Sequence, residues 1–144
     1  MQRIVAEPEA IALFQASIKE SPAGEVRVPV RVANPFDQGR FWESDFLVDT
    51  TPTMSIVPVD VLDAIGVDAR EIVRVYMADG SSVLRRVGLL RYTVAGISRT
   101  AEVVYGPEGV EPLLGALQLQ SMGLLVDLAG ERLLPRSALS PTLD

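Results

Sequence analysis

The chain has 144 residues, of which 48% are hydrophobic and 22% charged, and its net charge is −6. This length and hydrophobic content fit one globular domain with its own core. The negative charge disfavours a nucleic-acid partner, because phosphate binding needs clustered lysine and arginine. The sequence contains no cysteine and no histidine, which excludes disulfides, thiol nucleophiles, histidine-dependent triads and thiolate or imidazole zinc sites. We therefore predict neither a metal nor a cofactor.

The apolar stretches are all shorter than the roughly 20 residues that span a bilayer. Residues 1–20 begin with a single basic residue, Arg3, and the charged side chains that follow it break any apolar block of the signal-peptide type, namely Glu7, Glu9, Lys19 and Glu20. These features predict a cytoplasmic protein without a membrane partner.

Residues 1–24 form an N-terminal arm whose structure the sequence leaves open. Pro8 could begin a short helix, but the alternation of Phe14, Ala16 and Ile18 fits a strand equally well. The next segment is clearer, because every second residue is a valine from Val26 to Val32. That period of two predicts a half-buried strand.

A turn over residues 34–39 and a strand over residues 41–48 follow, and the strand leads directly into Asp49. Residues 58–65 are predicted to form a short helix. Pro58 suits its first turn and Gly66 suits the position after its C-terminus.

Two hairpins are predicted in the centre of the chain. Asp79 and Gly80 supply a tight turn between strands at residues 72–77 and 83–90. Two more strands, at residues 92–97 and 99–105, turn at Ala95 and Gly96.

The C-terminal third begins with Leu113, Leu114 and Gly115, followed by a short helix to Met122. Strands are expected at residues 124–127 and 132–135, and residues 136–144 are expected to be a frayed tail. The acidic end of the first of these strands, Asp127, is interpreted as an ordinary strand-end residue. The predicted protein is mostly β with one or two short helices.

Asp49 is the most informative residue, because an apolar run carries its carboxylate toward the interior. Burying a carboxylate is costly unless it is paired or hydrogen-bonded. The Asp49 carboxylate therefore either accepts hydrogen bonds from its own loop or serves in catalysis. The residues alone leave both interpretations open. Thr53 and Ser55 are interpreted as structural hydroxyls under this loop.

The order of these features resembles the retropepsin-like aspartic proteases, including small bacterial members. The resemblance covers residues 26–135 and rests on three segments: Leu47-Val48-Asp49-Thr50 with Thr53, Tyr76-Met77-Ala78-Asp79-Gly80, and Leu113-Leu114-Gly115. It implies a closed β-barrel of the acid-protease type with one lobe per chain, formed by residues 25–135.

The resemblance also implies an aspartic endopeptidase. Asp49 from each of two subunits would share one proton, so that one carboxylate acts as base toward water and the other as acid. A homodimer is required, because the chain carries one such motif. Thr50 would join the two active loops. The residues implied to bind the peptide or protein substrate are Thr51, Pro52 and, at the flap, Met77, Ala78, Asp79 and Gly80. Leu113, Leu114 and Gly115 would pack beneath the active loop.

The motif departs from the family pattern at its third and fourth places. Thr51 and Pro52 stand where the family has glycine followed by alanine or serine. Thr51 adds a β-branched side chain, and Pro52 removes an N–H and restricts Thr51 to extended conformations. One alternative is therefore a catalytically weak or inactive module for dimerisation or peptide binding. Another is a β-barrel that binds a small ligand.

Overall fold

The computed structural model describes residues 25–49, 52, 54–76, 79–127, 130 and 132–135. The predicted N-terminal arm (residues 1–24) and C-terminal tail (residues 136–144) lie outside this range. The same is true of five residues named in the sequence analysis: Thr50, Thr51, Thr53, Met77 and Ala78.

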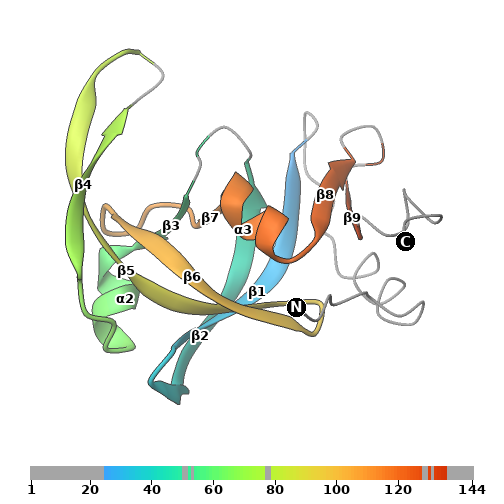
Figure 1. Ribbon diagram of the computed structural model, residues 1–144, viewed down its shortest axis with the longest axis horizontal. Helices are drawn as coiled ribbons and strands as arrows, with labels where there is room; N and C mark the ends of the chain where they lie inside the picture. The colour runs from blue at the N-terminus through green and yellow to red at the C-terminus, as the bar shows by residue number, and fades with distance from the viewer. Residues whose placement is uncertain are drawn as a thin grey trace.

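Seven strands form one sheet that curls into a barrel (Figure 1). In spatial order they are β1 (Val26–Asn34), β2 (Asp37–Val48), β7 (Leu113–Leu114), β3 (Ser55–Pro58), β6 (Ile97–Gly106), β5 (Ser82–Val94) and β4 (Glu71–Tyr76). The barrel closes because β1 also pairs with β5, where Arg31, Val32 and Ala33 lie opposite Thr93, Tyr92 and Arg91.

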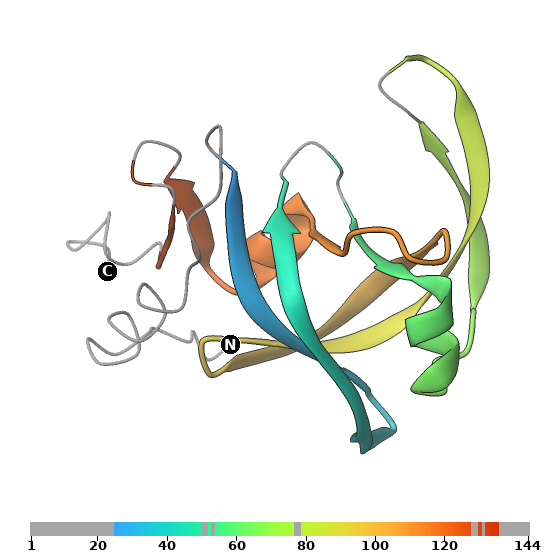
Figure 2. The ribbon, with the colours of Figure 1, turned by 180° about the vertical axis from the view of Figure 1, so that it is seen from behind.

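β4 stands outside the closed barrel and pairs, within the described residues, only with β5. The two strands are in antiparallel register from Glu71 opposite Val87 to Tyr76 opposite Ser82. Figures 1 and 2 show this pair as a long arm that rises beyond the end of the barrel. We call β4 with the facing half of β5 the hairpin arm.

The predicted alternation in β1 is confirmed. Its four valines at positions 26, 28, 30 and 32 are at most 2% exposed, because every second side chain of a strand points to the same face. Phe46 of β2 is fully buried in the same core. Burial of a side chain of this size stabilises the fold by roughly 1.5–3 kcal/mol.

Two short helices complete the described part of the chain, so the prediction of a mostly β protein is confirmed. α2 (Val59–Ala64) follows Pro58, and Gly66 adopts a positive φ of +79° just beyond its end. The predicted helix over residues 58–65 is thus one residue too long at each end. α3 (Ala116–Ser121) begins after Gly115, also close to the prediction.

Three further features differ from the prediction. The predicted strand at residues 83–90 and the first part of the one at 92–97 are a single strand, β5, which ends at Val94. Arg91 continues the ladder by lying opposite both Thr100 and Ala33. The first turn spans only residues 35–36, not 34–39. β3 was not predicted as a strand, since four residues are too few to show a clear period. The turn at Ala95 and Gly96 is confirmed.

The strands β8 (Leu124–Asp127) and β9 (Arg132–Pro135) form a separate two-stranded sheet. Asp127 accepts hydrogen bonds from the Gly130 N–H at 3.1 Å and from Arg132 Nε at 3.0 Å. It therefore has the ordinary strand-end role that was predicted. No helix among the described residues is long and apolar enough to cross a membrane.

Candidate active site

Asp49 directly follows the last residue of β2 and is half-buried. The end of β2 pairs in parallel with β7, so that Leu47 lies opposite Leu113 and Val48 opposite Leu114. The Asp49 N–H continues this pairing by donating to the Leu114 carbonyl at 3.1 Å. The position of Asp49 is therefore set by a strand far away in the sequence.

The chain after β7 also holds the far side of the loop that begins at Asp49 and ends at Met54. The Ala116 N–H donates to the Pro52 carbonyl at 3.2 Å. A Cβ atom added to Gly115 would lie 2.6 Å from the Met54 carbonyl carbon and oxygen, so only glycine allows this approach. The resemblance implied that Leu113, Leu114 and Gly115 pack beneath the loop, and these contacts agree with it.

Ser55 begins β3 immediately after the loop and is 1% exposed. Its Oγ accepts the Gly115 N–H at 2.9 Å. The prediction that Ser55 is a structural hydroxyl under the loop is confirmed, while Thr53 lies outside the described residues.

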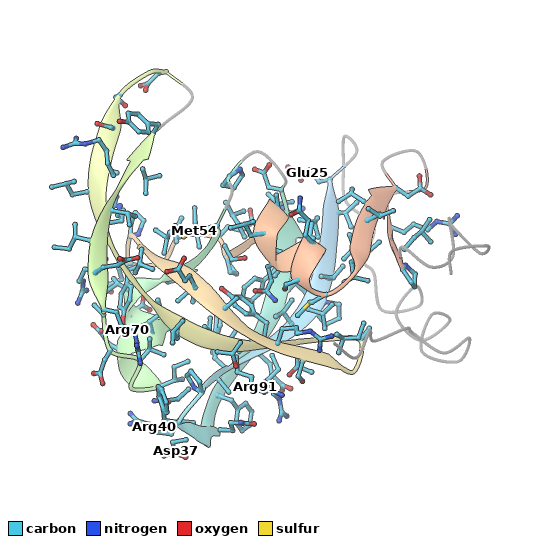
Figure 3. The ribbon with its side chains drawn as sticks, in the orientation of Figure 1. Glu25, Asp37, Arg40, Met54, Arg70 and Arg91 are labelled. Carbon is cyan, nitrogen blue, oxygen red and sulfur yellow. The ribbon has the colours of Figure 1, made fainter. Side chains whose placement is uncertain are left out.

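A groove of about 340 Å³ lies between the loop and the hairpin arm. Its walls are mostly apolar. The lining residues are Pro52, Met54, Ile56, Val73, Arg74, Val75, Tyr76 and Val104. Figure 3 labels Met54, which lies just ahead of β3. The groove brings Pro52, predicted to bind substrate, together with the strand that leads to the predicted flap.

Most of this lining was not predicted from the sequence. The sequence gives no clear signal for it, because Met54, Ile56 and Val57 are all apolar. In the structure Ser55 and Val57 of β3 are buried in the barrel, and Met54 and Ile56 alternate with them. Residues of that opposite parity must face out of the barrel. Val104 lies opposite Ile56 on β6 and shares its face. That pairing could not be read from the sequence.

Asp79 and Gly80 lie at the exposed turn of the hairpin arm, as predicted. Gly80 has a φ of +89°, a conformation that side chains disfavour. One carboxylate oxygen of Asp79 accepts the Ser81 N–H at 2.9 Å and the Ser81 hydroxyl at 2.6 Å. These two bonds lower the pKa of Asp79, because they favour its charged form.

The predicted site residues that the structure describes thus lie in two places. Asp49 and Pro52 share one loop, and Asp79 and Gly80 share the turn of the arm. The other four, Thr50, Thr51, Met77 and Ala78, lie outside the described residues, so their roles stay predictions. Within the described ranges, no three acidic side chains gather in a way that could hold a metal ion.

Comparison with solved structures identifies the architecture. The chain is similar to a retropepsin-like aspartic protease from Rickettsia conorii, with a TM-score of 0.51 and 17% identity, over 76% of this chain and 82% of that one. The chain has the retropepsin-like fold. The fold also matches the foamy viral protease-reverse transcriptase in complex with an RNA/DNA hybrid, with a TM-score of 0.52 and 17% identity.

The foamy viral match covers 69% of this chain but only 12% of the viral one, so this chain spans about an eighth of that protein. No protein-family model matches the sequence, and no curated protein matches it significantly. The similarity to a retropepsin-like fold therefore rests on three-dimensional structure.

Proposed function

We propose that this chain is a small, bacterial-type aspartic endopeptidase with an altered motif at residues 49–52, which acts as a homodimer in the cytoplasm. One observation carries the proposal. Asp49 is anchored through its main chain to Leu114, on a loop whose Pro52 forms a wall of an apolar groove beside the hairpin arm. The match to the Rickettsia retropepsin-like structure over most of both chains supports the bacterial type.

The proposed reaction uses the Asp49 carboxyls of two subunits, related by a two-fold axis. Two carboxyls placed side by side at this axis cannot both ionise, because their like charges repel, so the pair shares one proton. One carboxylate removes a proton from a water molecule, which adds to the carbonyl carbon of the scissile bond. The other carboxyl protonates the carbonyl oxygen. The C–N bond then breaks as the leaving amine takes the proton that the first carboxylate received from water, and the second carboxylate takes back a proton from a hydroxyl of the gem-diol. The proposed role of Thr50 is to join the two loops by hydroxyl hydrogen bonds.

The proposed substrate is an extended peptide or protein segment. Its backbone would pair with strand edges in the cleft, as peptides do in strand addition. The groove beside Pro52 is lined largely by apolar side chains and would accept an apolar side chain of the substrate. Residues 77–80 would cover the bound segment, and Thr51 would contact it from the loop.

Cleavage of a mixed peptide library from about pH 4 to pH 7, read by mass spectrometry, tests the proposal. Wild type and Asp49→Asn are compared at equal concentration, with sedimentation to establish the oligomeric state of each. We expect cuts by wild type that the variant does not make, and a dimer in both. A folded wild type that is monomeric, or that makes the same cuts as Asp49→Asn, would refute it.

A second candidate is a retropepsin-like module that dimerises or binds peptides without cleaving them. Pro52 favours it, because this residue departs from the family pattern and yet is built into both the groove wall and the bond to Ala116. A proline here cannot donate a main-chain hydrogen bond to a substrate. A folded dimer that binds library peptides and leaves them intact would support this candidate.

A further inference from the structure

Arg27 is a half-buried residue of β1 whose guanidinium binds two carboxylates. Its Nε and Nη2 donate to the two carboxylate oxygens of Glu111, at 2.7 Å and 3.2 Å. Its Nη1 donates at 2.9 Å to Glu25, which directly precedes β1. Two parallel bonds from one guanidinium to one carboxylate fix both distance and orientation, which a single contact between charges does not. The pair of Arg27 and Glu111 is therefore a directional link between two segments that are far apart in the sequence.

The Glu111 carboxylate belongs to the segment that enters β7. The next residue is Pro112, whose carbonyl accepts the Leu47 N–H at 3.0 Å. Leu113 then lies opposite Leu47, and Arg27 lies opposite the same residue from the other side of β2. The Arg27 side chain thus reaches across β2 and joins β1 to the start of β7.

β7 has little main-chain pairing of its own. It is two residues long, and its pairing with β3 consists of one opposed pair, Leu113 and Ile56. Pro112 has no N–H, so it offers β2 only its carbonyl. Because a strand this short gains few ladder bonds, a side-chain link at its start has a large share in fixing where it lies.

The position of β7 is passed on directly to Asp49. The Leu114 carbonyl, which ends β7, accepts the Asp49 N–H at 3.1 Å. A shift of β7 along or away from β2 would therefore move this acceptor, and with it the loop that carries the Asp49 carboxylate.

We propose that Arg27 is a positioning residue that holds β7 in register with β2 and, through β7, fixes the Asp49 loop. This inference rests on the proposed endopeptidase function for its effect on rate, but not for its effect on the loop. Neither Arg27 nor Glu111 is among the described residues that line the groove beside Pro52. The pair therefore acts on the alignment of Asp49, and misalignment of a catalytic group lowers kcat more than it changes KM.

The same strand carries a matched control. Arg31 lies four residues after Arg27, so its side chain points to the same face of β1. Its Nε donates at 3.0 Å to Glu43, which lies directly opposite on β2. Arg27→Met and Arg31→Met each remove an arginine–glutamate pair that starts on β1. They differ in that the Arg31 pair ends on β2, while the Arg27 pair ends at the start of β7.

Amide hydrogen exchange, followed residue by residue, tests the effect on the loop whether or not the protein cleaves peptides. The Leu47 and Asp49 amides report the pairing of β2 with β7. We expect both to exchange at least about threefold faster in Arg27→Met and in Glu111→Gln, and neither to change in Arg31→Met. The double variant should exceed the single variants by little, because both changes break one pair.

Amides in the ladder of β5 with β6 are the internal reference, since a protein that is merely less stable would exchange faster there as well. An equal rise at these reference amides would overturn the inference. Unchanged exchange at Leu47 and Asp49 in Arg27→Met, or the same change in Arg31→Met, would also overturn it.

Steady-state kinetics on one peptide that wild type cleaves test the effect on rate. We expect Arg27→Met to lower kcat about tenfold with KM within about twofold, and Arg31→Met to leave both unchanged. A kcat in Arg27→Met equal to that of wild type, or a rise in KM alone, would refute the positioning role. An inactive wild type would refute the proposed function, and the exchange measurement would then decide the positioning role by itself.

Discussion

Asp49 and Leu114 are joined by a main-chain hydrogen bond of 3.1 Å that extends the two-residue parallel pairing of β2 with β7. The bond uses the Asp49 N–H and not its carboxylate, so any residue except proline can form it. The anchor therefore survives the change of Asp49 to asparagine. This is why Asp49→Asn is a fair test of chemistry and not a test of folding.

Gly115→Ala should destabilise the protein, because its Cβ would lie 2.6 Å from the Met54 carbonyl group and 2.9 Å from the Ser55 nitrogen. These are main-chain atoms and cannot rotate away. We expect a loss of about 1–3 kcal/mol in the free energy of unfolding, measured by urea denaturation. Gly39→Ala is the control, since its Cβ would meet only the Asp37 carboxylate at an ordinary 3.6 Å. That variant should stay within about 0.5 kcal/mol of wild type, and equal losses in both would contradict the prediction.

Restoring the family pattern should raise peptidase activity. In Thr51→Gly with Pro52→Ala, the loop regains an N–H and loses a β-branched side chain. If the present residues displace the carboxylate by a fraction of an ångström, kcat/KM should rise at least about tenfold. The same change in the Asp49→Asn background should remain inactive. A folded, dimeric double variant with unchanged kcat/KM would show that these residues do not limit the rate.

The turn of the hairpin arm should respond to acid. The Ser81 N–H and hydroxyl donate to the Asp79 carboxylate and lower its pKa. The two bonds are thus present above the usual aspartate pKa of about 3.9 and are lost only as pH falls through the lower value of the folded chain. NMR titration of the Ser81 amide should show a midpoint below about 3.9. In Ser81→Ala the midpoint should move up toward that value, and a midpoint unaffected by this change would count against the assignment.

Alkaline conditions should weaken the fold through its buried tyrosines. Burial raises the pKa of Tyr92 and of Tyr105 above the usual value near 10. Below that usual value the two tyrosines are protonated in both the folded and the unfolded chain, so their contribution to the free energy of unfolding is fully present. As pH rises past it, the unfolded chain releases protons that the folded chain keeps, so the free energy of unfolding falls.

Urea denaturation between pH 8 and about pH 11 measures this effect. Tyr92→Phe should be less stable than wild type at pH 8, but its stability should fall less steeply above about pH 10. An equally steep fall in both proteins would show that Tyr92 does not contribute to the alkaline transition.

Local signals predicted most of the elements. Three features could be predicted because each depends on residues adjacent in sequence: the valine alternation of β1, the turn at Asp79 and Gly80, and the α2 helix between Pro58 and Gly66. Features that depend on contacts between distant segments could not be predicted from the sequence. The continuity of β5 through Arg91 depends on its pairing with both β6 and β1, and the groove depends on β3, β4 and β6 meeting.

The sequence by itself determined that any chemistry must use a carboxylate or another group besides thiol and imidazole, since the chain has no cysteine or histidine. It also singled out Asp49, because an apolar strand leads into it. Only the tertiary structure decided what holds that residue. Leu114 and Ala116 hold the loop through main-chain bonds, and the buried Ser55 hydroxyl accepts the N–H of Gly115, which lies between them. The resemblance implied only that Leu113, Leu114 and Gly115 pack beneath the loop. The individual bonds to the loop join main-chain atoms, which every residue type except proline offers, so side-chain identity could not specify them.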